Sequence, residues 1–214
     1  MFNVRKIPSL TYSAALSLLN GKDYKPLCRE TFLEHHNLNG VEEISVRHWD
    51  TRIIHFYPDD SIRISLNGWY TPTTMKRVRS LLNTPGPTAR SINLYKINGN
   101  LCVFVYKDKP DWRDAITYLY QDGILIKADG SSENPTLLAY HLSMITGHDV
   151  ENKDCEQIVR AMNLKQLIKL WRKGRRHYPN QICQYCDQTF LPALLTMAGE
   201  GGVDIIQERL REAA

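Results

Sequence analysis

The hydrophobic and polar positions of residues 28–129 follow the pattern of β-strands. Short runs that alternate in polarity or are rich in β-branched side chains are separated by turn-forming residues. The turns at residues 58–60, 67–68, 98–100 and 121–123 are rich in Asp, Asn and Gly, which tolerate tight or left-handed backbone, so adjacent strands are expected to pair as antiparallel hairpins. The expected strands are residues 29–35, 43–49, 51–57, 61–66, 90–97, 101–107, 115–120 and 124–127.

One short helix is expected before this pattern and another within it. Apolar residues recur at helical spacing over residues 12–19, and Thr11 precedes them in the position of an N-cap. A second helix is expected at residues 75–82, with Thr73 or Thr74 as its N-cap, before a Pro-Gly-Pro sequence stops it.

The periodicity changes to that of helices after the Asp-Gly-Ser-Ser sequence at residues 129–132. We therefore expect an α+β protein with an antiparallel β-rich domain at residues 1–130, which contains the short inserted helix, and a helical domain at residues 131–214. The expected helices of the second domain are residues 135–145, 155–162, 164–173, 191–198 and 203–212.

Composition places the chain among folded globular proteins. Of its 214 residues, 43% are hydrophobic and 23% are charged, values close to globular averages. No apolar run approaches the roughly 20 residues that a membrane-spanning helix requires, and the five cysteines are an odd number in a chain too long to depend on disulfides. These features favour a soluble protein of a reducing compartment, the cytoplasm.

The segment from residue 47 to residue 78 carries a family resemblance. It contains a hydrophobic hairpin, the turn Leu66-Asn67-Gly68-Trp69, the pair Thr73-Thr74 and then a basic helix. This order resembles a group of small uncharacterised bacteriophage proteins, and residues 99–105 and 122–124 are similar to later strands of that group. The resemblance covers about the first 130 residues and implies a phage or prophage origin, hence the host cytoplasm, but no specific activity.

Trp69 and Tyr70 directly follow the Asn-Gly turn and have two interpretations. They can cover the sheet as a fold-defining corner, with Thr71 to Thr74 ending the strand and starting the helix. Alternatively, one of the two aromatic side chains belongs to a recognition surface. The sequence alone leaves both interpretations open.

Positive charge is distributed unevenly, although the net charge is only +4. Residues 61–107 and 157–186 contain no Asp or Glu but several Lys and Arg. Around residue 164, an apolar helix face opposes a basic one, which is either a solvated surface or a surface for phosphates or an acidic partner. The candidate nucleic-acid-binding residues are Lys165, Lys169, Arg172, Lys173, Arg175 and Arg176, with Lys76, Arg77 and Arg79 as a second group.

Cys183 and Cys186 form a Cys-x-x-Cys pair, a spacing that places two thiolates on one tetrahedral zinc ion. No matching pair follows, so the other ligands would come from His177, or from a set on another segment. A structural zinc site, a redox pair and two unrelated thiols are the three interpretations of this motif. The additional candidate ligands are Cys155, His148 and His141.

Catalytic motifs are not evident in the sequence. Histidines at positions 35, 36, 48 and 55 lie near Asp50, Asp59 and Asp60, but acid–base or metal chemistry would require them to converge. We therefore expect a non-catalytic phage-type accessory protein that binds nucleic acid or a nucleic-acid-handling host complex. A protein inhibitor of a host defence system and a metal-dependent enzyme acting on nucleic acid are the alternatives.

Overall fold

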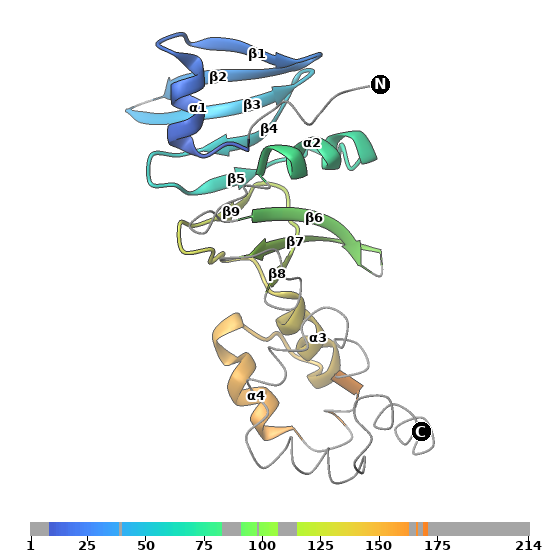
Figure 1. Cartoon of the computed structure of the whole chain (residues 1–214). Helices are drawn as coiled ribbons and strands as arrows, with labels where there is room; N and C mark the ends of the chain where they lie inside the picture. The colour runs from blue at the N-terminus through green and yellow to red at the C-terminus, as the bar shows by residue number, and fades with distance from the viewer. Residues whose placement is uncertain are drawn as a thin grey trace, which may run out of the picture. The chain divides into compact units, whose positions relative to one another are not determined.

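Six strands in the described part of the chain form one antiparallel sheet, here called sheet A (Figure 1). The computed structural model describes residues 9–38, 40–82, 91–97, 99–106, 115–162, 166 and 169–170. Sheet A has the strand order β1-β2-β3-β4-β5-β9. Its strands are β1 (Tyr24–Cys28), β2 (Thr31–Leu38), β3 (Val41–His48), β4 (Thr51–Phe56), β5 (Ile62–Ile64) and β9 (Ile124–Ile126).

Three further strands of the described residues form sheet B, in the order β6 (Ser91–Ile97), β7 (Asn100–Tyr106) and β8 (Ile116–Leu119). The expected strands agree closely with β3 to β9, so the α+β class with a β-rich N-terminal region is confirmed. The hairpin expected at residues 121–123 is wrong, because β8 belongs to sheet B whereas β9 pairs with β5 in sheet A. This pairing buries Ile124 and Ile126 beside the isoleucines of β5.

The expected strand at residues 29–35 is also wrong at its start. The chain turns at Arg29 and Glu30, where Glu30 adopts a left-handed φ of 54°, and β1 precedes this turn as an edge strand. The strand β1 contains Pro26, which an edge strand tolerates because one side of its backbone needs no ladder partner.

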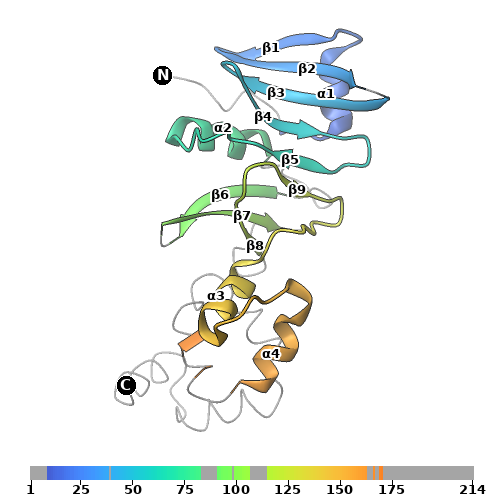
Figure 2. The ribbon, with the colours of Figure 1, turned by 180° about the vertical axis from the view of Figure 1, so that it is seen from behind.

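Alternate residues of sheet A form the core. Leu33, Ile44, Val46 and Ile54 have no exposed surface, and α1 (Tyr12–Leu19) belongs to the same hydrophobic cluster. Figures 1 and 2 show α1 on one side of β1 to β3, and no described helix of the unit Met1–Pro135 covers the other side of these strands. Thr11 caps α1 as expected, since its hydroxyl accepts a hydrogen bond from the amide of Ala14.

The helix α2 (Pro72–Leu82) begins earlier than expected. Its N-cap is Thr71, whose hydroxyl accepts from the Thr74 amide at 3.2 Å, and not Thr73 or Thr74. Pro72 explains the difference, because proline fits the first helical position, where no amide hydrogen is needed, and the residue before it becomes the cap. The inward positions of the helix are buried as expected, and α2 packs against β6.

The chain divides into two compact units, Met1–Pro135 and Thr136–Ala214. In the second unit, α3 (Leu137–Thr146), the short 3-10 helix Asn152–Asp154 and α4 (Cys155–Ala161) are described, and α3 and α4 match two expected helices. Residues 164–173 are described only at three positions, and the helices expected at 191–198 and 203–212 lie outside the described residues, so the helical domain as a whole stays a prediction. Among the described helices, none has the length and apolar character needed to span a membrane.

Candidate functional site

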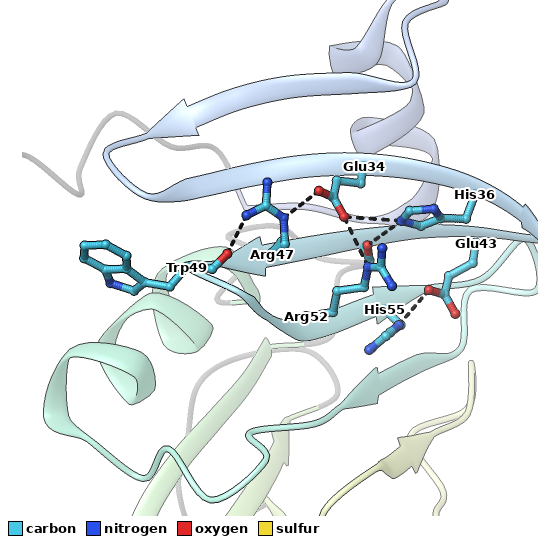
Figure 3. A network of polar contacts seen from close by, with 8 residues as sticks. Glu34, His36, Glu43, Arg47, Trp49, Arg52 and His55 are labelled. Carbon is cyan, nitrogen blue, oxygen red and sulfur yellow. Dashed lines mark hydrogen bonds and ion pairs between the residues drawn. The ribbon is translucent and has the colours of Figure 1, made fainter.

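The side of sheet A that faces away from α1 is polar. Because side chains alternate along a strand, the residues between the core positions project to this second side. The strand register places Glu34 opposite Ser45, Ser45 opposite His55, and His55 opposite Arg63. Figure 3 shows several of these side chains on the open side of the sheet. We call this surface the charged face, which comprises Phe32, Glu34, His36, Glu43, Ser45, Arg47, Arg52, His55 and Arg63.

Glu34 lies at the centre of the charged face and is only 12% exposed. Its carboxylate accepts hydrogen bonds from Arg47 Nε at 2.6 Å and Arg52 Nε at 3.1 Å. Burial opposes ionisation of this carboxyl, but the two arginines outweigh burial and lower its pKa. Glu34 therefore bridges two arginines that oppose each other across β3 and β4 and offsets part of their charge.

A second pair joins His55 to Glu43, with 2.7 Å between His55 Nδ1 and a Glu43 carboxylate oxygen. Burial raises the pKa of Glu43, but its interactions with His55 and Tyr57 outweigh burial, and the pKa is lowered. Burial and the neighbouring carboxylate raise the pKa of the Tyr57 hydroxyl to about 12. Both carboxylates of the charged face are thus ionised and paired at neutral pH.

The charged face does not form a catalytic triad. Ser45 is fully buried, and its hydroxyl lies 3.1 Å from His36 Nε2, the same ring nitrogen that lies 3.4 Å from Glu34. A triad requires the acid on the other ring nitrogen, where it can orient the base. The adjacent residues His35 and His36 project to opposite sides of β2, so the four histidines singled out in the sequence do not converge.

The turn between β3 and β4 carries Trp49 in an unusual conformation. Its φ is 54°, in the left-handed region that bulky residues rarely adopt, and its side chain is 56% exposed. The Trp49 amide donates to the Glu30 carbonyl at 2.9 Å, and Arg47 donates to the Trp49 carbonyl. Two neighbouring segments therefore hold Trp49 in this conformation while its indole remains in water.

His48 supports the same turn from inside. Its Nδ1 lies 2.8 Å from the Glu30 carbonyl oxygen, so this nitrogen carries the proton and donates it. Burial lowers the pKa of His48, and the charge of Arg77 adds to this effect. Arg77 is held close by a hydrogen bond of 3.0 Å to the Thr31 hydroxyl. At neutral pH, His48 is an uncharged group whose Nε2 is an acceptor.

A second turn, after β5, presents Trp69, which is 60% exposed. Asn67 and Gly68 both adopt left-handed φ values, 48° and 82°. The Asp122 carboxylate accepts hydrogen bonds from the amides of Leu66 and Asn67 at 2.7 and 2.8 Å. A residue more than 50 positions away thus fixes the turn that carries Trp69.

Tyr120 also holds the turn that carries Trp69. Its hydroxyl accepts from the Leu66 amide at 2.8 Å and donates to Asp122 Oδ1. Its ring makes an edge contact with Tyr70, at 5.9 Å between ring centroids. The pKa of Tyr120 is raised by burial and by the hydrogen bond to Asp122, so its hydroxyl keeps the proton that this contact needs.

The two turns and the start of α2 enclose a cavity of about 420 Å³, which we call the tryptophan pocket. Ile53 forms part of its wall because the register shifts between Val46 and Arg47, leaving Ile53 as the extra residue of a bulge. None of the described lining residues carries a positive charge. The lining consists of His48, Trp49, Asp50, Thr51, Ile53, Trp69, Thr71 and Thr74.

The chemistry of the tryptophan pocket suits a flat organic group. Two indoles offer apolar faces with a negative quadrupole, and the surrounding hydroxyls and one carboxylate offer hydrogen-bond acceptors. A pocket with an apolar wall and few polar groups is typical of small-ligand sites, and its volume lies in their usual range. Trp69 is exposed and lines this pocket, and its role as a recognition residue stays a prediction.

The cations expected to bind phosphate have different environments. Lys76 is exposed on α2, whereas Arg77 is half-buried against Thr31 and Arg79 stacks over Tyr95 at 4.5 Å. Lys169 is exposed. A role in phosphate binding stays a prediction for these residues, and the remaining candidates lie outside the described residues: Lys165, Arg172, Lys173, Arg175 and Arg176.

The proposed zinc ligands Cys183, Cys186 and His177 also lie outside the described residues. Of the additional candidates, Cys155 is buried and donates to the Glu151 carbonyl, and burial raises the pKa of its thiol to about 11. In the described ranges, no three His, Cys, Asp or Glu side chains are grouped to hold a metal ion. The zinc site therefore stays a prediction.

Sequence reasoning identified Trp69 but missed Trp49 and Asp122. Trp49 was expected as the last residue of the strand at residues 43–49, whereas β3 ends at His48 and Trp49 lies in the turn. Comparison with protein-family models, curated proteins and solved structures gives no match. The resemblance to bacteriophage proteins consequently stays a prediction, and the functional argument depends on the geometry of the site.

Proposed function

We propose that this protein is a non-catalytic accessory protein that binds single-stranded nucleic acid, free or presented by a host complex. The observation that carries the proposal is the tryptophan pocket, in which Trp49 and Trp69 are more than half exposed while their turns are firmly held. Unpaired bases stack on exposed aromatic side chains with a gain of about 1–3 kcal/mol per base. An unstacked base fits both the flatness and the apolar wall of the pocket.

The cations around the pocket supply the complementary contact to phosphate. Arg47 and Arg52 flank the turn that carries Trp49, and Lys76 and Arg77 follow Thr74 on α2. Glu34 offsets part of this charge, so the N-terminal unit alone provides a modest field. We propose that the basic face of the helical C-terminal domain, with Lys169 and its neighbours, is a separate surface for phosphate.

A phage-type protein that binds a host defence protein is the second candidate. It is favoured by the same exposed aromatic side chains, Trp49, Trp69 and Tyr70, because exposed apolar groups also mark protein interfaces. The two functions differ in their salt dependence. Phosphate contacts release counterions, so affinity for nucleic acid falls steeply with salt, whereas apolar protein contacts tolerate salt.

The test is fluorescence anisotropy with labelled single-stranded and duplex oligonucleotides at 50 and 200 mM salt. We expect the wild type to bind the single strand more tightly than the duplex. The variant carrying both Trp49→Ala and Trp69→Ala should bind the single strand with about 10–100-fold lower affinity than the wild type. Val41→Ala is the matched control, because Val41 is 56% exposed at the opposite end of β3 from Trp49.

Equal affinity of the double variant and the wild type for the single strand would contradict the proposal. A pull-down from host cells with and without nuclease separates the second candidate. A protein captured in the presence of nuclease, and lost in the double tryptophan variant, would support the protein-binding function instead.

A further inference from the structure

We infer that the tryptophan pocket selects guanine among the bases of a single strand, through the carboxylate of Asp50. This inference rests on the proposed function. Asp50 is exposed, lines the pocket and follows Trp49 directly in the turn. Within the described ranges it makes no hydrogen bond or ion pair, although the hydrogen bond and charge of Glu34, and then the charge of Asp50, raise the pKa of the nearby Arg47. Both oxygens of the carboxylate can therefore accept hydrogen bonds from a ligand.

The charge of the pocket determines which end of a nucleotide enters. Asp50 is negative, His48 is uncharged with an acceptor Nε2, and none of the described lining residues is cationic. A phosphate group would be repelled by Asp50, whereas a base brings an apolar face for the indoles and N–H groups for the carboxylate. The phosphates are therefore expected to remain outside, near Lys76 and the arginines that flank the turn.

Among the four bases, guanine matches a carboxylate best. Its Watson–Crick edge presents two neighbouring donors, N1–H and the 2-amino group, and an ionised carboxylate is an acceptor with two oxygens. Adenine and cytosine each place a ring-nitrogen acceptor beside their amino group, and thymine and uracil place a carbonyl on each side of one N–H. A carboxylate facing any of these three edges meets an acceptor, which is unfavourable.

The same edge explains why the ligand must be single-stranded. In a duplex, the N1–H and 2-amino groups of guanine are already paired with cytosine, and the base faces are stacked. An unpaired guanine offers its donors and both faces at once. The hydroxyls of Thr51, Thr71 and Thr74 lie on the pocket wall, where the carbonyl of guanine needs a donor. The Thr71 and Thr74 hydroxyls are hydrogen-bonded to each other at 2.9 Å, so this pair has one hydroxyl hydrogen left for a ligand.

The test uses labelled ten-residue thymidine oligonucleotides with a single central substitution by guanine, inosine, adenine or cytosine. Inosine is the informative analogue because it keeps N1–H and lacks the 2-amino group. We expect the guanine oligonucleotide to bind about tenfold or more tightly than those with adenine or cytosine, with inosine between them. The Asp50→Asn variant should reduce this preference to less than about twofold, because the side-chain amide offers one acceptor and one donor where the carboxylate offers two acceptors.

The outcomes separate the two levels of the proposal. If the wild type binds all oligonucleotides equally and the double tryptophan variant loses this binding, the guanine inference is wrong and the nucleic-acid function survives. If the wild type binds none of them, both are wrong. An arginine side chain presents paired N–H donors similar to those of guanine. If the protein binds an arginine-rich peptide in this pocket and shows no preference among the bases, the guanine inference is wrong and a protein partner is favoured. Unchanged thermal unfolding of Asp50→Asn ensures that altered preference reflects the pocket.

Discussion

Substitution of Asp122 by Ala tests how the turn of Trp69 is held. A single carboxylate oxygen of Asp122 accepts hydrogen bonds from the amides of Leu66 and Asn67 and from the hydroxyl of Tyr120. Because Asp122 is exposed, we assign each of these bonds the lower part of the range for a hydrogen bond, about 0.5–1 kcal/mol. Asp122→Ala is therefore expected to lower the free energy of unfolding by about 2 kcal/mol, which corresponds to a Tm decrease of roughly 4–8 °C.

The assay combines thermal unfolding, followed by near-ultraviolet circular dichroism, with oligonucleotide binding. Asp122→Asn keeps one acceptor oxygen and should retain about half of the lost stability. Tyr120→Phe removes the hydroxyl that bonds to the same oxygen, so its effect and that of Asp122→Asn should not be additive. Asp129→Ala is the matched control, because Asp129 accepts from the nearby Ser131 amide and not from the turn of Trp69.

Binding distinguishes a positioning role of Asp122 from a purely structural one. At a temperature where the variant is fully folded, a mobile Trp69 turn should still weaken affinity for the single strand, and Asp129→Ala should not. The reasoning would be refuted by an Asp122→Ala protein that unfolds at the wild-type temperature and binds the oligonucleotide with unchanged affinity.

Three further predictions concern the charged face and His48. Glu34→Gln leaves Arg47 and Arg52 facing each other without a carboxylate, so it should lower the free energy of unfolding measured in urea by about 1–2 kcal/mol. Arg52→Gln should lower it by less than about 0.5 kcal/mol, because Arg52 is half exposed. Equal losses in the two variants would contradict the central role of Glu34. Since burial lowers the pKa of His48, the unfolded chain binds this proton more readily, so the free energy of unfolding should decrease as the pH falls below about 6.5, and His48→Gln should flatten that part of the profile. The lowered pKa values of Glu34 and Glu43 predict a further decrease below about pH 4.3, which should be smaller in Glu34→Gln.

The alternation of apolar and polar residues was sufficient to predict β3 to β9, but not β1. The strand β1 contains Pro26, and the turn after it consists of Arg29 and Glu30, which are not typical turn residues. The hairpin of β1 and β2 is fixed instead by contacts of Glu30 with the turn of β3 and β4. A local pattern contains no information about such contacts.

The pairing of β5 with β9 was missed for a related reason. The Asp-Gly sequence at residues 122–123 is a typical hairpin turn, yet Asp122 bonds to the backbone of Leu66 and Asn67, and β9 completes the core beside β5. The Asp-Gly turn favours pairing of β9 with β8, whereas burial of Ile124 and Ile126 favours pairing of β9 with β5. Burial of the two isoleucines decides the topology.

The candidate site was only partly visible in the sequence. Trp69 could be identified from the turn before it, but the pocket also requires Trp49, the bulge at Ile53 and the start of α2, which only the fold brings together. Counting cations was also insufficient, because Arg77 and Arg79 contact Thr31 and Tyr95 within the fold. A sequence segment with several Lys and Arg and no Asp or Glu therefore does not by itself define a binding surface.

The central claim is that an unpaired base enters the tryptophan pocket. The most direct measurement follows the indole N–H signals of Trp49 and Trp69 by nuclear magnetic resonance, assigned with Trp49→Phe and Trp69→Phe, during titration with a single-stranded oligonucleotide. We predict that both signals shift in proportion to binding, and that an equal concentration of duplex shifts them much less. Saturable binding of the single strand that leaves both indole signals in place would contradict the claim.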